Sequence, residues 1–248
     1  MIFKISLSAL LISSFLFATQ DMKKWLRPLE VPQPMDNKLT SERVELGKLL
    51  YFDARLSSSE QFSCATCHSP KRGWTDLEPV SKALGAGRGP RNSPTILNAG
   101  YQNRQFWDGR VKTLEEQALG PIEADVEMNM PLDELIAKLD KIDGYVKLFN
   151  QAYPSEGGIT KITLAKAIAS FERTVVSTIA PFDKYAMGDK KAISKKAVAG
   201  FDLFKGKAHC MDCHDNFNFS NGSFHNIGLN DGELQGKELG RYLTKQRA

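Results

Sequence analysis

The 248-residue chain is poor in cysteine, and all four of its cysteines lie in two short motifs. After the first twenty residues it has no apolar run long enough to span a membrane. No block of basic residues is interleaved with aromatics, so nucleic acid is not an expected partner. Sustained alternation of apolar and polar residues is also missing, which argues against extended strands. The composition of the chain, 42% hydrophobic and 25% charged with a formal net charge of +4, is typical of a globular protein. We predict that its fold is mainly α-helical.

The first twenty residues, MIFKISLSALLISSFLFATQ, are typical of an export signal. Lys4 supplies a positive start, and residues 5–17 form an apolar stretch that is too short to span a bilayer with folded flanks. Ala18 is a plausible cleavage point, and the alternative is an uncleaved anchor. We therefore predict a signal peptide over residues 1–18 and a periplasmic mature protein.

The chemistry of the chain is concentrated in "SCATCH" and "HCMDCH", which each contain Cys-x-x-Cys-His. Two disulfides are the simplest alternative for four exported cysteines, but disulfides do not require the adjacent histidine. A zinc ribbon needs its two cysteine pairs much closer together in sequence. Covalent c-type haem explains the whole pattern, because two thiols form thioethers and the histidine ligates iron. The candidate haem-binding residues are Cys64, Cys67, His68, Cys210, Cys213 and His214.

The distribution of further iron ligands separates the two predicted haem sites. No histidine lies between His68 and His209, so the first half offers no second histidine to its haem. After His214 there is no methionine, and His225 is the only histidine. An open iron position permits chemistry, whereas a sixth protein ligand favours electron transfer. The pattern favours a reactive site at the first motif.

Helical patterns and one long loop organise the chain. We expect an extended arm over residues 21–38, then a helix capped by Thr40 or Ser41 with Leu46, Leu49 and Leu50 on one face. Residues 69–94 are rich in glycine and proline and predict a loop. Further helices are expected after the capping box at residues 113–116, from residue 131, and over residues 164–175 and 198–204. Residues 180–196 are polar and are expected to connect two halves.

Four segments of the sequence closely resemble the bacterial dihaem cytochrome c peroxidase/MauG family. They are LGKLLYFDARLSSSEQFSCATCHSPKRGWTD, RGPRNSPTILNAGYQNRQFWDGR, LEEQALGPIEADVEMNM and APFDKYAMGD. The resemblance runs from about Leu46 to the C-terminus. It implies two cytochrome c-like helical domains, each with one covalently bound c-type haem. We expect the peroxidatic haem domain at residues 19–185 and the electron-transfer haem domain at residues 186–248.

The resemblance also assigns roles to single residues around the first haem. His68 would be the proximal ligand of the peroxide-reacting haem. Gln117 and Glu127 match the polar pair over its distal face, with Met128 beside them. Glu127 would move a proton between the two peroxide oxygens, and Gln117 would orient the peroxide. Without the resemblance, Glu127 would be read as an ordinary surface carboxylate.

Two further roles come from the resemblance alone. Trp107, in FWDGR, matches the tryptophan that couples the two haems, although by itself it would be read as a core aromatic. His214 would hold the haem that receives electrons. Asn92, in PRNSP, matches a calcium ligand between the domains, whereas a plain turn asparagine is the simpler interpretation.

The sequence departs from the family pattern in two places. Leu84 stands where many members carry a histidine that caps the peroxidatic haem, and leucine cannot ligate iron. We therefore expect a first haem that is five-coordinate or water-bound at rest. The chain also stops at GRYLTKQRA, where family members continue, so the second domain is expected to be truncated relative to the family.

Three functions remain open at this point. The leading hypothesis is an exported peroxidase that reduces hydrogen peroxide to water with electrons from a small cytochrome c or copper protein. The first alternative is a MauG-like oxidase that modifies a protein substrate, which Leu84 favours. The second is a dihaem electron-transfer cytochrome. The sequence also leaves open a homodimer.

Overall fold

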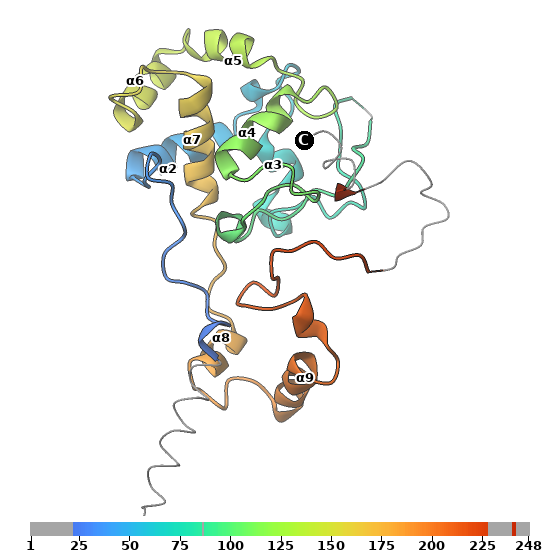
Figure 1. Cartoon of the computed structure of the whole chain (residues 1–248). Coiled ribbons are helices and arrows are strands. Elements are labelled where there is room, and N and C mark those ends of the chain that lie inside the picture. Colours follow the sequence, from blue (N-terminus) through green and yellow to red (C-terminus); the bar gives the residue numbers. More distant parts are fainter. Residues whose placement is uncertain (1–21, 86, 228–239, 242–248) are drawn as a thin grey trace, which may run out of the picture. The chain divides into compact units, whose positions relative to one another are not determined.

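The computed structural model describes residues 22–85, 87–227 and 240–241 (Figure 1). This part of the chain is mainly helical, as predicted, and contains isolated β-bridges but no strand. None of its helices is long and apolar enough to cross a membrane. The predicted signal peptide at residues 1–18 lies outside the described residues, as does most of the stretch after residue 227.

The chain divides into two compact units. Among the described residues, the larger unit comprises 31–85, 87–177 and 240–241, and the smaller unit comprises 22–30 with 178–227. This division differs from the predicted domains at 19–185 and 186–248 in two respects. The break falls at Ser177, and the N-terminal arm belongs with the C-terminal segment because Trp25 is fully buried there.

Two helices that cross closely form the centre of the larger unit. Helix α2 (Ser41–Tyr51) packs against helix α7 (Lys161–Glu172). Gly47 permits this approach, since a Cβ atom there would lie 1.9 Å from the backbone oxygen of Ala167. Thr40 caps α2 as expected: its side chain accepts a hydrogen bond from the Arg43 amide. One prediction for this helix was wrong, because Leu49 is half exposed while the other two leucines are buried.

Three more helices complete the large core. They are α4 (Leu114–Glu123), α5 (Leu132–Leu139) and α6 (Asp143–Ala152). The Thr113 side chain caps α4 by accepting from the Glu116 amide, as the sequence predicts. Glu116 reaches back one residue further than in a standard capping box, to the Lys112 amide. The apolar stripes of α5 and α7 face this core, whose buried members include Leu46, Leu50, Leu135, Leu139, Phe149, Leu164 and Ile168.

Short turns and a long loop, which include the first motif, connect α2 to α4. The turns are η1 (Ala54–Leu56), the one-turn helix α3 (Cys64–Cys67), η2 (Pro70–Arg72) and η3 (Ala99–Tyr101). The predicted loop over residues 69–94 is confirmed apart from η2 and two isolated bridges. Asp76 is buried at its centre and accepts hydrogen bonds from the Glu78 amide and the Ser93 hydroxyl. These bonds fix the path of the loop past the motif.

The smaller unit is built around a cluster of aromatic side chains. It contains α8 (Pro181–Ala186), α9 (Lys195–Lys205) and the turn η4 (Cys210–Asp212). Residues 180–196 are therefore not simply a connector, since α8 contributes Phe182 and Ala186 to this core. The ring of Trp25 lies at its centre, with centroid distances of 5.1 to 6.4 Å to Phe182, Phe201, Phe204 and Phe219. Edge-on aromatic pairs of this kind add to the stabilisation from burial.

Candidate functional site

The first Cys-x-x-Cys-His motif forms one wall of a pair of adjoining hollows in the larger unit. Helix α3 carries both cysteines, and the two thiols are free. The hollows open to solvent, have empty volumes of about 560 and 1280 Å³ when that open space is counted, and share Cys67 and His68 in their linings. The residues common to both hollows are Cys67, His68, Lys82, Gln117, Pro121, Glu127 and Glu172.

His68 is held in one orientation by the long loop. Its Nδ1 atom lies 2.9 Å from the Pro94 carbonyl oxygen, which can only accept, so Nδ1 carries the proton. This leaves Nε2 as the atom available to a metal. Burial lowers the pKa of His68, which favours the neutral imidazole that binds metals. The Tyr51 hydroxyl donates to the His68 carbonyl at 3.1 Å and anchors its backbone.

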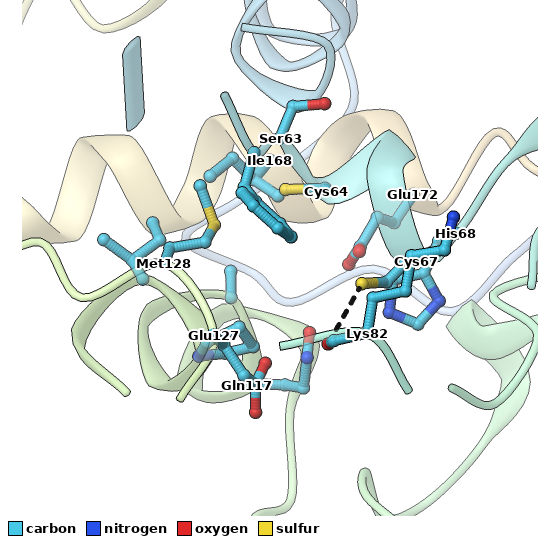
Figure 2. A pocket seen from close by; sticks show the side chains of 14 residues that line it. Ser63, Cys64, Cys67, His68, Lys82, Gln117, Glu127, Met128, Ile168 and Glu172 are labelled. Atoms are coloured by element: carbon cyan, nitrogen blue, oxygen red, sulfur yellow. Dashed lines mark hydrogen bonds between the residues drawn. The ribbon is translucent and has the colours of Figure 1, made fainter. Parts of the chain in front are cut away.

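Gln117 and Glu127 lie on the side of the hollow opposite the motif (Figure 2). Gln117 comes from α4, and Glu127 from the turn that follows it. Burial raises the pKa of the Glu127 carboxyl, and the positive charge of Arg110 opposes that shift. Met128 follows Glu127, is buried and lines the smaller hollow. The structure thus brings this polar pair and His68 around a single space.

Trp107 and Asn92 both line the larger hollow and contact each other. The Trp107 indole is 56% exposed, and its Nε1 donates to the Asn92 carbonyl at 2.8 Å. The Asn92 side chain donates to the Glu78 carbonyl at 2.6 Å. Within the described residues, no group of three or more His, Cys, Asp or Glu side chains is arranged to hold a metal ion. The calcium role of Asn92 and the coupling role of Trp107 remain predictions.

Leu84 is half-buried in the long loop. Its amide donates to the Val126 carbonyl at 3.0 Å, which ties the long loop to the residue that precedes Glu127. Leu84 does not line either hollow. The coordination of the first haem at rest therefore remains a prediction from the sequence.

Glu172 is a residue that the sequence analysis missed. It is 5% exposed, lines both hollows, and its Oε2 atom is buried without a hydrogen-bond partner in the described structure. Burial raises its pKa to about 8, so the carboxyl is mostly protonated at neutral pH. The helical periodicity could have revealed it, because Glu172 follows Leu164 and Ile168 at intervals of four residues on a stripe that is otherwise apolar.

The second motif has different surroundings in the smaller unit. Its cysteines, Cys210 and Cys213, are free and half-buried, and the His214 ring is exposed. The Nδ1 atom of His214 lies 2.9 Å from the Phe219 carbonyl, so this imidazole also presents Nε2. The Trp25 Nε1 atom is buried with no hydrogen-bond partner among the described residues. His225 is exposed, and its ring contacts the Asn221 side chain.

Both sites fit covalently bound haem. In each motif the two cysteines are unpaired, and the histidine is oriented through Nδ1 to a backbone carbonyl. At the first site the thiols and the imidazole line hollows that Glu172 also lines, and the buried Oε2 atom of Glu172 has no hydrogen-bond partner in the described structure. A disulfide or zinc site would not require this arrangement.

Residues 41–191 match the family described as di-haem cytochrome c peroxidase. The chain belongs to this family. Two relatives of the di-haem cytochrome c peroxidase family show its breadth. The methylamine utilization protein MauG of Methylophilus methylotrophus is 44% identical over 88% of this chain and 64% of its own length. Cytochrome c551 peroxidase of Pseudomonas aeruginosa is 39% identical over 82% of this chain and 58% of its own length.

Solved structures of the di-haem cytochrome c peroxidase family support the fold. A MauG-like protein associated with microbial copper homeostasis has a TM-score of 0.70 at 31% identity, covering 81% of this chain and 61% of that protein. The diheme peroxidase BthA from Burkholderia thailandensis has a TM-score of 0.62 at 25% identity, covering 72% of this chain and 50% of that protein. The chain spans about three-fifths of the length of the curated relatives named above. The di-haem family implies c-type haem as the cofactor.

Proposed function

We propose that this protein is an exported, periplasmic dihaem peroxidase that reduces hydrogen peroxide to water with electrons from a small redox protein. The observation that carries the proposal is the placement of Gln117 and Glu127 across the first hollow from His68. A neutral imidazole on one side and a carboxylate with an amide on the other are the groups that this chemistry needs. The second motif has no comparable pair among the residues named around it.

The proposed role of Glu127 is to move one proton. Haem iron held by His68 would supply the electrons and bind the peroxide. The reaction consumes two electrons and two protons for each peroxide and releases two water molecules. Glu127 accepts the proton of the inner peroxide oxygen and returns it to the departing oxygen, which leaves as water. A carboxyl with a raised pKa exchanges protons more readily near neutral pH than an ordinary surface carboxylate.

Gln117 and Trp107 have supporting roles in the proposal. The Gln117 amide donates a hydrogen bond that orients the peroxide beside Glu127. Trp107 is assigned to electron transfer between the haems on the basis of the family resemblance. Its indole is held by the hydrogen bond to the Asn92 carbonyl and remains half-exposed, so it is oriented without being enclosed.

A MauG-like oxidase is the second candidate. Leu84 favours it, since a first haem without a loop ligand is ready to react before any reduction. The identity to the MauG proteins, 44% and 46%, also exceeds the 39% identity to cytochrome c551 peroxidase. In that case the oxidising equivalents would be drawn from a protein substrate rather than from a small redox protein.

Peroxide consumption under three conditions tests the proposal. The haem-loaded protein is mixed with hydrogen peroxide alone, with a reduced small cytochrome c or copper protein, and with a chemical reductant. We expect catalytic consumption in the last two mixtures and at most one turnover in the first. Turnover only when a protein substrate is added would instead support the MauG-like oxidase. If peroxide is not consumed in any mixture, the result would support the hypothesis of a dihaem electron-transfer cytochrome.

A further inference from the structure

The two units differ in charge. The described residues of the smaller unit, 22–30 and 178–227, contain ten lysines and arginines against six aspartates and glutamates. Residues 31–177 contain eighteen lysines and arginines against nineteen aspartates and glutamates. The net values are +4 and −1, so the positive charge of the described chain resides in the smaller unit. A field of one sign attracts partners of the other sign and raises their association rate.

Much of this positive charge is on and around α9. Lys195 and Lys196 occupy its first turn and are exposed. Lys205 ends the helix, and Lys207 follows it. Lys205 pairs within the helix with Asp202 at 3.6 Å, whereas Lys195, Lys196 and Lys207 form no ion pair within the described residues. The charge of these three lysines is therefore not balanced by the neighbouring side chains that the structure describes.

The outer face of α9 is flat and partly apolar. Ala199 and Gly200 are exposed there, and a Cβ atom built on Gly200 would meet no atom within 4 Å. Leu203 lies one turn further along the same face and is 54% exposed. The opposite face carries Phe201, which packs on Trp25. The outer face is therefore a small apolar strip with lysines at both ends.

This strip borders the second haem-attachment motif within the same unit. Helix α9 packs against η4, which contains Cys210. Lys24 also lies beside this motif, with its Nζ atom 3.7 Å from the Met211 sulfur, but its charge is balanced by an Asp215 carboxylate oxygen at 2.9 Å. A partner that rests on α9 would therefore lie close to the second haem. Small apolar centres with charged rims are typical of weak, fast redox complexes.

We propose that the exposed face of α9, from Lys195 to Lys207, is the docking surface for a small electron-carrier protein with an acidic surface around its redox centre. This inference rests on the proposed function, in which electrons arrive at the second haem. It adds the sign of the partner's charge and the surface that it uses. The aromatics between these lysines, Phe201 and Phe204, pack against Trp25 and are not available to stack on bases, so nucleic acid is a poorer match.

Charge reversal at one end of the strip tests the proposal. The double variant Lys195→Glu/Lys196→Glu removes the positive end, and glutamates in the first turn of a helix are favourable, so α9 is expected to stay folded. The matched control, Lys38→Glu/Lys141→Glu, changes the net charge equally at exposed positions of the larger unit. Thermal melting of both variants checks that the fold is retained.

The readout is stopped-flow reduction of the second haem in the haem-loaded protein, without peroxide. The probes are an acidic blue copper protein and a basic cytochrome c of similar potential. We expect the acidic probe to react faster, and added salt to slow it. The α9 variant should slow it by about 10-fold or more, and the control by less than about 3-fold.

Several outcomes would overturn the docking surface. The first is an equal change, or no change, in the reduction rate of the second haem in the two double variants. The second is faster reduction of the second haem by the basic probe than by the acidic probe. Binding of anionic lipid vesicles that is lost with Lys195 and Lys196, while the copper protein is unaffected, would assign the strip to a membrane surface instead. Peroxide consumption driven by a chemical reductant distinguishes the two proposals, because it fails only if the proposed function fails.

Discussion

The same five-residue attachment motif occurs in two different environments in this molecule. The first motif opens into hollows walled by Gln117, Glu127 and Glu172, next to a core of buried aliphatic and aromatic side chains. The second motif lies beside an aromatic cluster around Trp25 and a lysine-rich helix, and its histidine is exposed. Each histidine is nevertheless oriented in the same way, through Nδ1 to a backbone carbonyl at 2.9 Å.

We infer from the comparison that the motif would attach the cofactor without determining its chemistry. Proton transfer needs ionisable groups at the reacting centre, and the first site supplies them. Electron transfer needs a partner to approach, and the second site has positive charge and exposed surface nearby. We infer that the surroundings of each motif separate a reaction site from an electron-receiving site.

The largest expected effect comes from Glu127→Gln. Loss of the proton-moving carboxylate should slow the reaction of the oxidised protein with hydrogen peroxide by about 10²–10⁴-fold. Stopped-flow absorption measures this rate. The matched control is Asp212→Asn, which removes an exposed carboxylate within the second motif and should leave the rate unchanged. Equal losses in both variants would erase the proposed distinction between the two sites.

The next effect concerns the aromatic core of the smaller unit. Trp25→Ala should destabilise that unit by about 3–5 kcal/mol, because it leaves a large cavity among four phenylalanine rings. Hydrogen exchange followed by mass spectrometry should show faster exchange over residues 178–227 and little change over 41–172. Trp25→Phe, which keeps most ring contacts, should have a smaller effect. Equal acceleration in both regions would show that the units do not unfold independently.

The sequence predicted the helical class correctly, since helical periodicity is a local feature. The compact units divide the described chain differently from the predicted domains, because nothing local to Trp25 reveals that the N-terminal arm packs with residues 178–227. It predicted Glu127 through the family resemblance, and only the structure shows that Arg110 acts on its carboxyl. Glu172 was missed because a single charged residue at the end of an apolar stripe usually points to solvent.

A third effect is a pH dependence of stability caused by Glu172. Burial raises its pKa to about 8 in the folded protein, whereas an unfolded glutamate has a pKa of about 4.3. Between these values the folded state holds a proton that the unfolded state releases, so the free energy of unfolding falls as the pH rises. Glu172→Gln should remove roughly 2 kcal/mol or more of this dependence between about pH 5 and pH 8. Denaturant titrations at the two pH values measure the free energy of unfolding. If Glu172 played no part, this free energy would fall by the same amount between the two pH values in the wild-type protein and in the Glu172→Gln variant.

The smallest expected effect comes from Arg110. Its guanidinium lowers the pKa of the Glu127 carboxyl, against the effect of burial. Arg110→Gln should therefore raise that pKa and move the acidic limb of the peroxide reaction to higher pH by up to about one unit. Arg110→Lys keeps the charge and should restore the original profile. An unchanged pH dependence of the peroxide reaction in Arg110→Gln would show that Arg110 does not influence this reaction.

The most direct test of the account is the EPR spectrum of the oxidised, haem-loaded protein before and after one equivalent of hydrogen peroxide. The account predicts a high-spin ferric signal from the haem attached at Cys64 and Cys67, which peroxide removes within the mixing time. The Glu127→Gln variant should show the same initial signal and lose it much more slowly. Two low-spin signals that do not respond to peroxide would contradict the account.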